Sequence, residues 1–136
     1  MDSDDIVKAA LLVIRDGRML LCRKSRDTDL LITPGGRIER GESDIDCLLR
    51  ETAEELGAGV HLANIQYIDT YRDQAAGALQ RIVEVRLYRA DLQGEQPSPH
   101  AEIAELIWFA PSDDYALLSP SLRNKILPDL MARGLL

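Results

Sequence analysis

The chain has 136 residues, of which 46% are hydrophobic and 29% charged, and these values are typical of a single globular domain spanning residues 1–136. Its longest apolar run, residues 9–14, is much shorter than the roughly 18 residues that a membrane helix needs, and its acidic N-terminus lacks the apolar segment of a secretory signal. The net charge of −7 argues against a nucleic-acid polymer as partner, because such binding requires a basic face.

Three short strands are predicted in the first quarter of the chain. The run from Ile6 to Ile14 is rich in Val, Ile, Leu and Ala, which is typical of a strand buried on both faces. Asp16-Gly17 is a hairpin turn signal, after which Arg18–Arg23 returns as a second strand. Leu30–Thr33 is expected to be a third strand, ended by the sequence Pro34-Gly35-Gly36.

The clearest helix is predicted from Ser43 to Leu56, with Ser43 as its N-cap and Gly57 at its C-terminal cap. Its apolar residues follow helical spacing and form one stripe: Ile45, Leu48, Leu49, Thr52, Ala53 and Leu56. We expect this stripe to face the core.

The two cysteines, Cys22 and Cys47, are too few for a disulfide scaffold and lack the spacing of metal ligands. Both lie in apolar patterns, so we expect small buried thiols and a reducing, cytoplasmic compartment. Cys47 conflicts with this expectation in one respect, because it lies off the apolar stripe of the predicted helix.

The second half of the chain predicts further strands and a last helix. In chain order, we expect strands over Val60–Asp69, Leu79–Asp91 and Ile107–Ala110 and a helix over Leu118–Leu130. Residues 73–77 are expected to form the turn between the first two of these strands, and Pro120 and Pro128 should limit the helix. The order of elements predicts a mixed α/β fold with a partly antiparallel sheet.

Acidic residues gather on the predicted helix and just before it. Residues 39–55 hold seven acids against two arginines, which accounts for most of the net charge of the chain. On a helical wheel Glu51, Glu54 and Glu55 share an arc of roughly 100°, directed away from the expected core. Such clustered carboxylates repel one another, and they are the oxygen ligands that Mg²⁺ or Mn²⁺ prefers. An ordinary solvated acidic face is the alternative.

The spacing of residues around this helix favours the metal site. The fixed residues are Gly36, Glu42, Arg50, Glu51, Glu54, Glu55 and Gly57. Seven such positions match by chance at about 10⁻⁸ per starting point at average residue usage. The segment resembles the Nudix box, G-x5-E-x7-R-E-U-x-E-E-x-G-U with U apolar, and differs from it only at the soft positions Thr52 and Ala58.

This resemblance implies an α/β/α sandwich built on a mixed sheet, with divalent cations (Mg²⁺ or Mn²⁺) that hold a diphosphate linked to a group X. It implies metal ligation by Glu54 and Glu55, with Glu51 as a further ligand or as the residue that orients water. Glu42 would be another ligand or an anchor of the loop. The resemblance also implies that Arg50 supports the site by pairing with a carboxylate. Gly36, which precedes these residues, and Gly35 would permit a close approach of the backbone to the site or a positive φ.

The family often uses an acid downstream of the box as a ligand or general base, and Glu102 and Glu105 are the candidates here. Both precede the predicted strand at residues 107–110. Strand alternation would place Glu105 on the face of Ile107 and Phe109, whereas Glu102 lies farther back in a polar loop that could swing towards the metals. We favour Glu102 as the base, with plain solvation of either residue as the alternative.

Five charged residues outside the box are candidate substrate contacts. Arg23, Lys24 and Arg26 lie at the end of the second predicted strand, where they could meet phosphates or simply be solvated. Glu84 and Arg86 share one face of a predicted strand, which could line a pocket or carry an exposed ion pair.

Among the activities that the resemblance implies, the short chain favours a MutT-type nucleoside triphosphate pyrophosphohydrolase, which releases a nucleoside monophosphate and pyrophosphate. Hydrolysis of ADP-sugars or dinucleoside polyphosphates is the alternative within the enzyme class. A nucleotide-sensing module without activity usually lacks box acids, and all are present here. An isoprenoid diphosphate isomerase would need catalytic Cys and metal-binding His residues in suitable places. The partner is thus expected to be a small-molecule nucleotide, and homodimers are common in the family.

Overall fold

The computed structural model describes residues 5–136, without the side chains of residues 78–80, so the acidic residues 1–4 lie outside the described part. The strands are β1 (Ile6–Leu12), β2 (Ile14–Arg15), β3 (Arg18–Lys24), β4 (Gly35–Arg37), β5 (Val60–Ala75), β6 (Ala78–Gly94) and β7 (Ile103–Phe109). The helical elements are α1 (Asp44–Leu56), the 3₁₀ turn η1 (Tyr115–Leu117), the π-helical segment η2 (Leu122–Ile126) and α2 (Leu127–Ala132). No helix of residues 5–136 is both long enough and apolar enough to cross a membrane.

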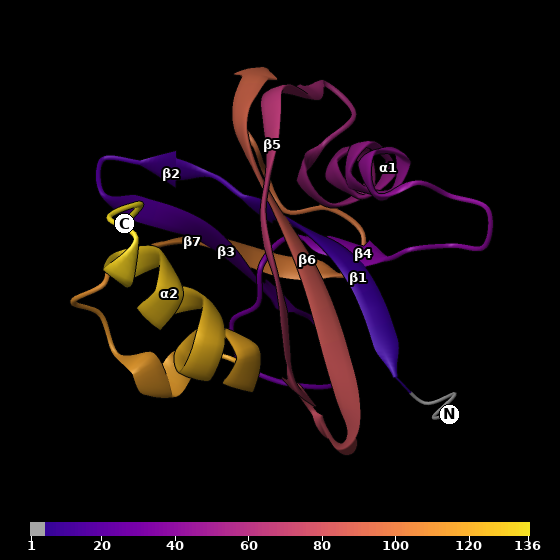
Figure 1. Cartoon of the computed structure of the whole chain (residues 1–136). Coiled ribbons are helices and arrows are strands. Elements are labelled where there is room, and N and C mark those ends of the chain that lie inside the picture. Colours follow the sequence, from indigo (N-terminus) through magenta and orange to yellow (C-terminus); the bar gives the residue numbers. More distant parts are fainter. Residues whose placement is uncertain (1–4) are drawn as a thin grey trace.

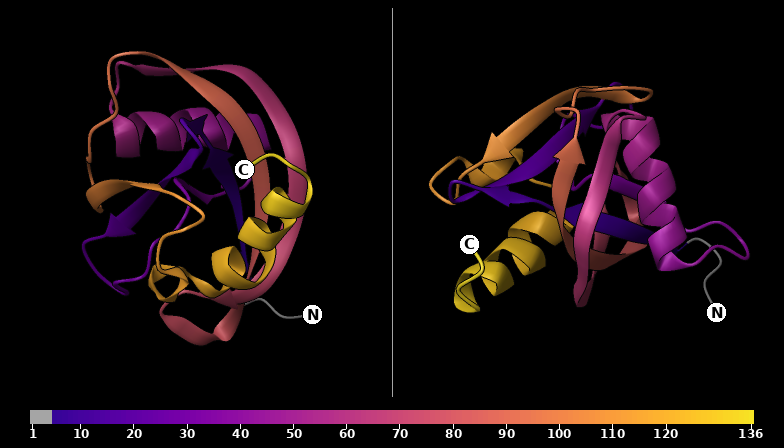
Figure 2. Two further views of the ribbon diagram at one scale, coloured as in Figure 1. Left: turned by 90° about the vertical axis from the view of Figure 1, so that its left-hand side faces the viewer. Right: turned by 90° about the horizontal axis from the view of Figure 1, so that it is seen from above.

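Two sheets form the frame of the molecule (Figure 1). The larger has the order β4-β1-β6-β5, in which β1 runs parallel to β6 and antiparallel to β4, and the long hairpin of β5 and β6 is antiparallel. The smaller sheet, β2-β3-β7, is antiparallel throughout. Helices α1 and α2 lie on opposite sides of the larger sheet (Figure 2). The predicted α/β class with a mixed sheet is therefore confirmed.

Strand β1 lies between two hydrophobic clusters. Ala10 and Leu12 belong to the cluster beneath α2, whereas Ala9 and Leu11 belong to the cluster beneath α1. Both faces are thus buried, which is why the sequence of this strand shows no alternation of apolar and polar residues. The predicted hairpin turn after it is also confirmed, because Asp16 and Gly17 both have positive φ angles.

The strand predicted at Leu30–Thr33 is wrong. Leu31 and Ile32 form only isolated bridges, and the regular strand is β4, which includes the glycines that were expected to end the pairing. A Cβ atom at Gly35 would lie 2.2 Å from the carbonyl oxygen of Ala9 on β1. The absence of a side chain therefore allows the close approach of these two strands.

The later strands begin or end at other residues than predicted. β5 continues to Ala75 and only residues 76–77 form the turn, so the turn predicted from Asp73 is wrong at its start. β5 is an edge strand whose outer residues face solvent, and its polar sequence therefore resembles a loop. β7 begins at Ile103, which is buried, so Glu105 lies within the strand and not in a loop before it.

Helix α1 has the predicted caps but a different buried face. Ser43 Oγ accepts a hydrogen bond from the Asp46 amide at 3.0 Å, and the chain leaves the helix at Gly57 with a φ of 125°. The buried residues are Cys47, Leu48, Thr52, Glu55 and Leu56. Ile45 and Leu49, which were predicted to face the core, are 36% and 46% exposed. The predicted stripe is therefore wrong by a rotation of the helix, which turns Glu55 inward.

This rotation explains the position of Cys47. The residue is fully buried although it lies off the predicted stripe, and Cys22 on β3 is 1% exposed. Both thiols are free, and burial raises the pKa of Cys47 to about 11 and that of Cys22 to about 12. The prediction of small buried thiols is confirmed.

The C-terminal helical segment starts at Pro120 and continues past Pro128. Leu118 forms a bridge with Leu31 instead of joining the helix. The amide of Leu127 donates to the carbonyl of Leu122, five residues earlier, just before Pro128. A π-turn at this point accommodates a residue without an N–H group, so the expectation that Pro128 limits the helix is wrong.

Candidate active site

The start of strand β4 and the last turns of α1 meet at two glycines, Gly35 and Gly36. The amide of Gly35 donates to Glu55 Oε1 at 2.8 Å. A Cβ atom at Gly36 would lie 2.3 Å from the carboxylate carbon of Glu51, so this carboxylate occupies the space that a side chain would fill. The two glycines therefore position Glu51 and Glu55 next to each other at the edge of the larger sheet.

Arg50 ties the preceding loop to the helix. Its Nε and Nη2 donate to the two oxygens of Glu42 at 2.7 and 2.9 Å, and its Nη1 donates to Glu51 at 2.8 Å. Glu54 lies 3.6 Å from the same guanidinium. The expected pairing of Arg50 with carboxylates is confirmed.

Glu42 serves as an anchor of the loop in this arrangement. Besides Arg50 it accepts a hydrogen bond from the Glu39 amide at 2.9 Å, so both of its oxygens are engaged. These hydrogen bonds, that of Arg50 first, lower the pKa of Glu42 to about 2. Of the two alternatives for Glu42, the geometry favours the anchor over the metal ligand.

The three acids of the helix differ in their surroundings. Glu55 is 7% exposed, and burial raises its pKa to about 7 against the opposing effect of the Gly35 hydrogen bond. Burial also raises the pKa of Glu51, whereas the side chain of Glu54 is 53% exposed. The expectation that all three face away from the core is wrong for Glu55, because the glycines of β4 draw this residue inward. Within residues 5–136 no three Asp, Glu, His or Cys side chains converge on one point.

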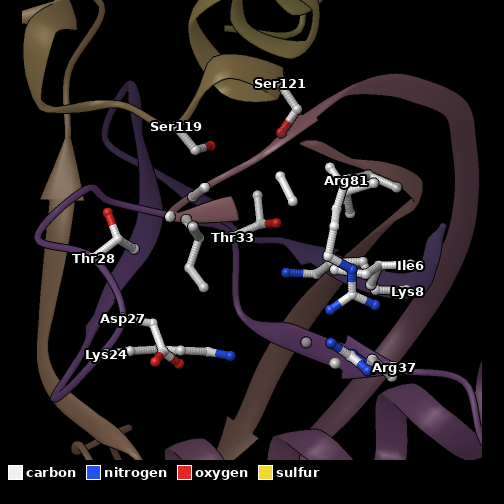
Figure 3. A pocket seen from close by; sticks show the side chains of 18 residues that line it. Ile6, Lys8, Lys24, Asp27, Thr28, Thr33, Arg37, Arg81, Ser119 and Ser121 are labelled. Carbon is white, nitrogen blue, oxygen red and sulfur yellow. The ribbon is translucent and has the colours of Figure 1, made fainter. Parts of the chain in front are cut away.

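A cavity of about 410 Å³ adjoins these acids. Gly35, Gly36 and Arg37 form the side of the cavity next to α1. Figure 3 shows the charged residues: Lys8, Arg37 and Arg81 lie on one side, and Lys24 with Asp27 on the other. Four basic side chains and one acid line this cavity, so its charge suits an anionic ligand although the protein as a whole is acidic.

Lys8 connects the cavity to the acids of the helix. It lies on β1 opposite Arg37, and burial lowers its pKa, partly opposed by the negative charges of Glu55 and Glu51. The sequence contains a signal for this residue, since a lysine within an otherwise apolar strand needs either an ion pair or access to water. The site residues predicted from sequence do not include Lys8.

Of the substrate contacts proposed from sequence, Lys24 lines this cavity, whereas the other four do not. Arg23 forms an ion pair with Glu105, directly across from it on β7, and Arg26 is exposed. Glu84 and Arg86 lie on the other face of β6 from the cavity residues Val83 and Val85.

On that face they form a network with the start of α1. Arg86 donates to Glu84 at 2.9 Å and to Asp44 at 3.1 Å, and Arg72 donates to Glu84 at 2.8 Å. Of the two alternatives for Glu84 and Arg86, the structure shows the ion pair.

Neither candidate for the downstream acid lines the cavity. Glu105 is held by Arg23. Glu102 is exposed, and its carbonyl oxygen accepts a hydrogen bond from the Ser25 amide at 2.8 Å. This hydrogen bond fixes the backbone of Glu102, while its carboxylate makes no hydrogen bond or ion pair with residues 5–136.

Comparison with known proteins decides the family. Residues 5–130 match the NUDIX domain. The chain belongs to the Nudix family. It is 28% identical over 108 residues to the CTP pyrophosphohydrolase of Escherichia coli, an overlap that covers 76% of this chain and 75% of that protein.

Solved structures agree with this assignment. The MutT Nudix hydrolase of Burkholderia pseudomallei superposes with a TM-score of 0.74 at 26% identity, covering 88% of this chain and 93% of that one. The MutT protein of Methanosarcina mazei has a TM-score of 0.76 at 16% identity and covers 98% of both chains, which shows the shared fold. The protein is therefore a Nudix hydrolase, a family that generally uses divalent metal ions and acts on small-molecule nucleotides.

Proposed function

We propose that this Nudix hydrolase is a Mg²⁺- or Mn²⁺-dependent nucleoside triphosphate pyrophosphohydrolase, which cleaves its substrate to a nucleoside monophosphate and pyrophosphate. The observation that carries the proposal is the junction of a basic cavity with the carboxylates of α1 at Gly35 and Gly36. A triphosphate can lie across this junction. Some of its phosphate oxygens would lie near the cations of the cavity, and the others near a divalent cation held by the acids.

The donor set fits a hard divalent cation. Glu51, Glu54 and Glu55 supply carboxylate oxygens, and Glu51 lies against Gly36, which has no side chain to obstruct it. A cation held by these groups would neutralise the diphosphate and make a bound water acidic. Because Glu51 is held by Arg50 and Glu55 by the Gly35 amide, Glu54 is the acid that can move towards the cation without breaking a short hydrogen bond.

The residues of the chain then have separate tasks. Arg50 keeps Glu51 in place and balances the charge of Glu42 and Glu54. Glu102 is proposed to accept the proton of the attacking water, since its carboxylate makes no hydrogen bond or ion pair with residues 5–136. Its backbone is held beside the loop after β3 by the Ser25 amide. Glu105 remains the alternative and would first have to leave Arg23.

The E. coli relative supports this proposal, because its name describes a nucleoside triphosphate and pyrophosphate release. The similarity extends over three quarters of both chains.

A product assay tests the proposal. With Mg²⁺ we expect the protein to convert nucleoside triphosphates to equal amounts of nucleoside monophosphate and pyrophosphate, without release of inorganic phosphate. Nucleotide sugars and dinucleoside polyphosphates are assayed in parallel. Glu95→Gln, which changes an exposed glutamate outside the box, serves as the matched control and should retain full activity. Faster hydrolysis of either parallel class, or release of inorganic phosphate from the triphosphates, would overturn the assignment.

A further inference from the structure

Three cations of the cavity have no partner within the described chain. Lys8, Lys24 and Arg37 make no side-chain hydrogen bond or ion pair with any part of residues 5–136. Five arginines on other strands and helices are paired with acids: Arg23, Arg50, Arg72, Arg86 and Arg133. In a chain of net charge −7, three unpaired cations around one cavity mark a place for an anion that the chain itself does not supply.

The cavity also lacks a surface on which a nucleobase could stack. The chain has one Trp, four Tyr and one Phe, all within the described residues, and none of them lines the cavity. Tyr71 is buried and donates to Asp129 at 2.6 Å. Tyr67 and Tyr88 pack against each other, and so do Phe109 and Tyr115. Trp108 lies under the guanidinium of Arg15.

The other polar residues of the lining suit phosphate oxygens. They are the hydroxyl residues Thr28, Thr33, Ser119 and Ser121. A hydroxyl group donates to a phosphate oxygen as readily as to a carbonyl, and it does not distinguish one base from another by a fixed donor and acceptor pattern. The composition of the lining thus favours recognition of charge over recognition of a base.

We propose that this cavity selects substrates by the phosphates of X, an inference that rests on the proposed function. The enzyme then accepts nucleoside triphosphates of different bases alike. It disfavours nucleoside diphosphates that are linked to a neutral sugar. A neutral sugar would displace water from the half-buried Lys8 and Lys24 and from the exposed Arg37 without replacing its hydrogen bonds, which is costly for charged groups. A phosphorylated X replaces them with charge-assisted hydrogen bonds.

The first test compares substrates. Steady-state kcat/KM is measured with Mg²⁺ for ATP, GTP, CTP and UTP and for ADP-glucose and UDP-glucose. Because no aromatic ring lines the cavity, we expect the four triphosphates to agree within about fivefold, the lower bound of what base stacking contributes. The nucleotide sugars should be slower than the triphosphates by about tenfold or more, the contribution of a charged hydrogen bond. A preference for one base beyond this range, or equal turnover of sugars, would overturn the inference.

The second test examines the cavity without turnover. Binding of inorganic tripolyphosphate, which has no base, is measured by calorimetry for the wild-type protein, Lys8→Met and Lys24→Met. Lys125→Met, at an exposed position on η2, is the matched control. We expect wild-type and control proteins to bind alike and each cavity variant to bind about tenfold more weakly or worse. Thermal unfolding of each variant checks that it is folded.

The two readouts separate the inference from the proposed function. Tripolyphosphate binding that depends on Lys8 and Lys24, in a protein that hydrolyses no phosphoanhydride, supports the cavity and rejects the activity. Hydrolysis of triphosphates by the Lys8→Met and Lys24→Met variants with unchanged KM, together with unchanged tripolyphosphate binding, supports the activity and overturns the inference.

Discussion

At the scale of single residues, Glu54 differs from its neighbours in the same helix. It is exposed and loosely paired, so that its charge contributes little to the fold, whereas a cation would need it. We expect Glu54→Gln to lower kcat by several orders of magnitude. The metal-free variant should be as stable as the wild type or more stable by a few tenths of a kcal/mol, because repulsion from Glu51 is relieved. Activity assays with saturating Mg²⁺ and thermal unfolding check this, and near wild-type turnover would exclude Glu54 as a ligand.

Glu102 and Glu105 differ in their contacts, because Glu105 is paired with Arg23 and the carboxylate of Glu102 has no partner within residues 5–136. Glu102→Gln changes an exposed, unpaired carboxylate, so we expect kcat to fall strongly with KM nearly unchanged. Glu105→Gln weakens the ion pair with Arg23 and should affect mainly stability. The measurement is kcat across pH for both variants. Loss of activity in Glu105→Gln alone would reverse our assignment, and full activity of both would direct attention to Glu51.

At the scale of elements, the close contact of β4 with α1 and β1 gives two neighbouring glycines different tasks. A Cβ at Gly36 meets only the end of the Glu51 side chain, which can move, whereas a Cβ at Gly35 meets the backbone of Ala9 at a φ of 135°. We expect Gly36→Ala to fold normally but to bind Mg²⁺ weakly, and Gly35→Ala to lose about 1–3 kcal/mol or more of stability. Calorimetric Mg²⁺ titration and denaturant unfolding distinguish the two, and equal loss of stability would contradict this division.

The elements also show what sequence could and could not predict. Caps, the hairpin turn and the buried strand were predictable, because each depends on the local chemistry of a few residues such as Ser43 and Gly17. The face of α1 was not, because it depends on tertiary contacts: the Gly35 amide binds the carboxylate of Glu55, while Ile45 and Leu49 remain exposed. The glycines of β4 resembled a strand terminator for the same reason, since only the partner strand shows why they are needed.

At the scale of the whole molecule, net charge described the protein less well than the distribution of charge. The value of −7 rests largely on residues 39–55, and a basic cavity lies directly beside them. The motif places the candidate acids in one stretch of the sequence, whereas the cations come from β1, β3, β4 and β6 and meet only in the folded chain. Of the three cations proposed at the end of the second strand, Lys24 lines the cavity, and Arg23 and Arg26 do not.

The stability of the whole protein should depend on pH and metal together, because Glu55 is buried with a pKa of about 7 against an ordinary value of 4.5. Between these values the folded protein binds more protons than the unfolded chain, so the metal-free protein loses stability as pH rises from about 5 to 8. A cation needs the ionised carboxylate, so Mg²⁺ should raise the Tm more at pH 8 than at pH 5, with about 2.7 kcal/mol of stabilisation at 100 times its Kd. The pKa of Glu42 is shifted in the opposite direction, to about 2, so this residue acts at lower pH and does not mask the effect.

Thermal unfolding with and without Mg²⁺ between pH 5 and 8 tests this linkage between pH, metal and stability. Glu55→Gln should flatten the metal-free profile and remove most of the Mg²⁺ effect, while Glu95→Gln should leave both unchanged. A metal-free Tm that rises from pH 5 to 8 in the wild type, or a Glu55→Gln profile as steep as the wild type's, would show that Glu55 is not the group responsible.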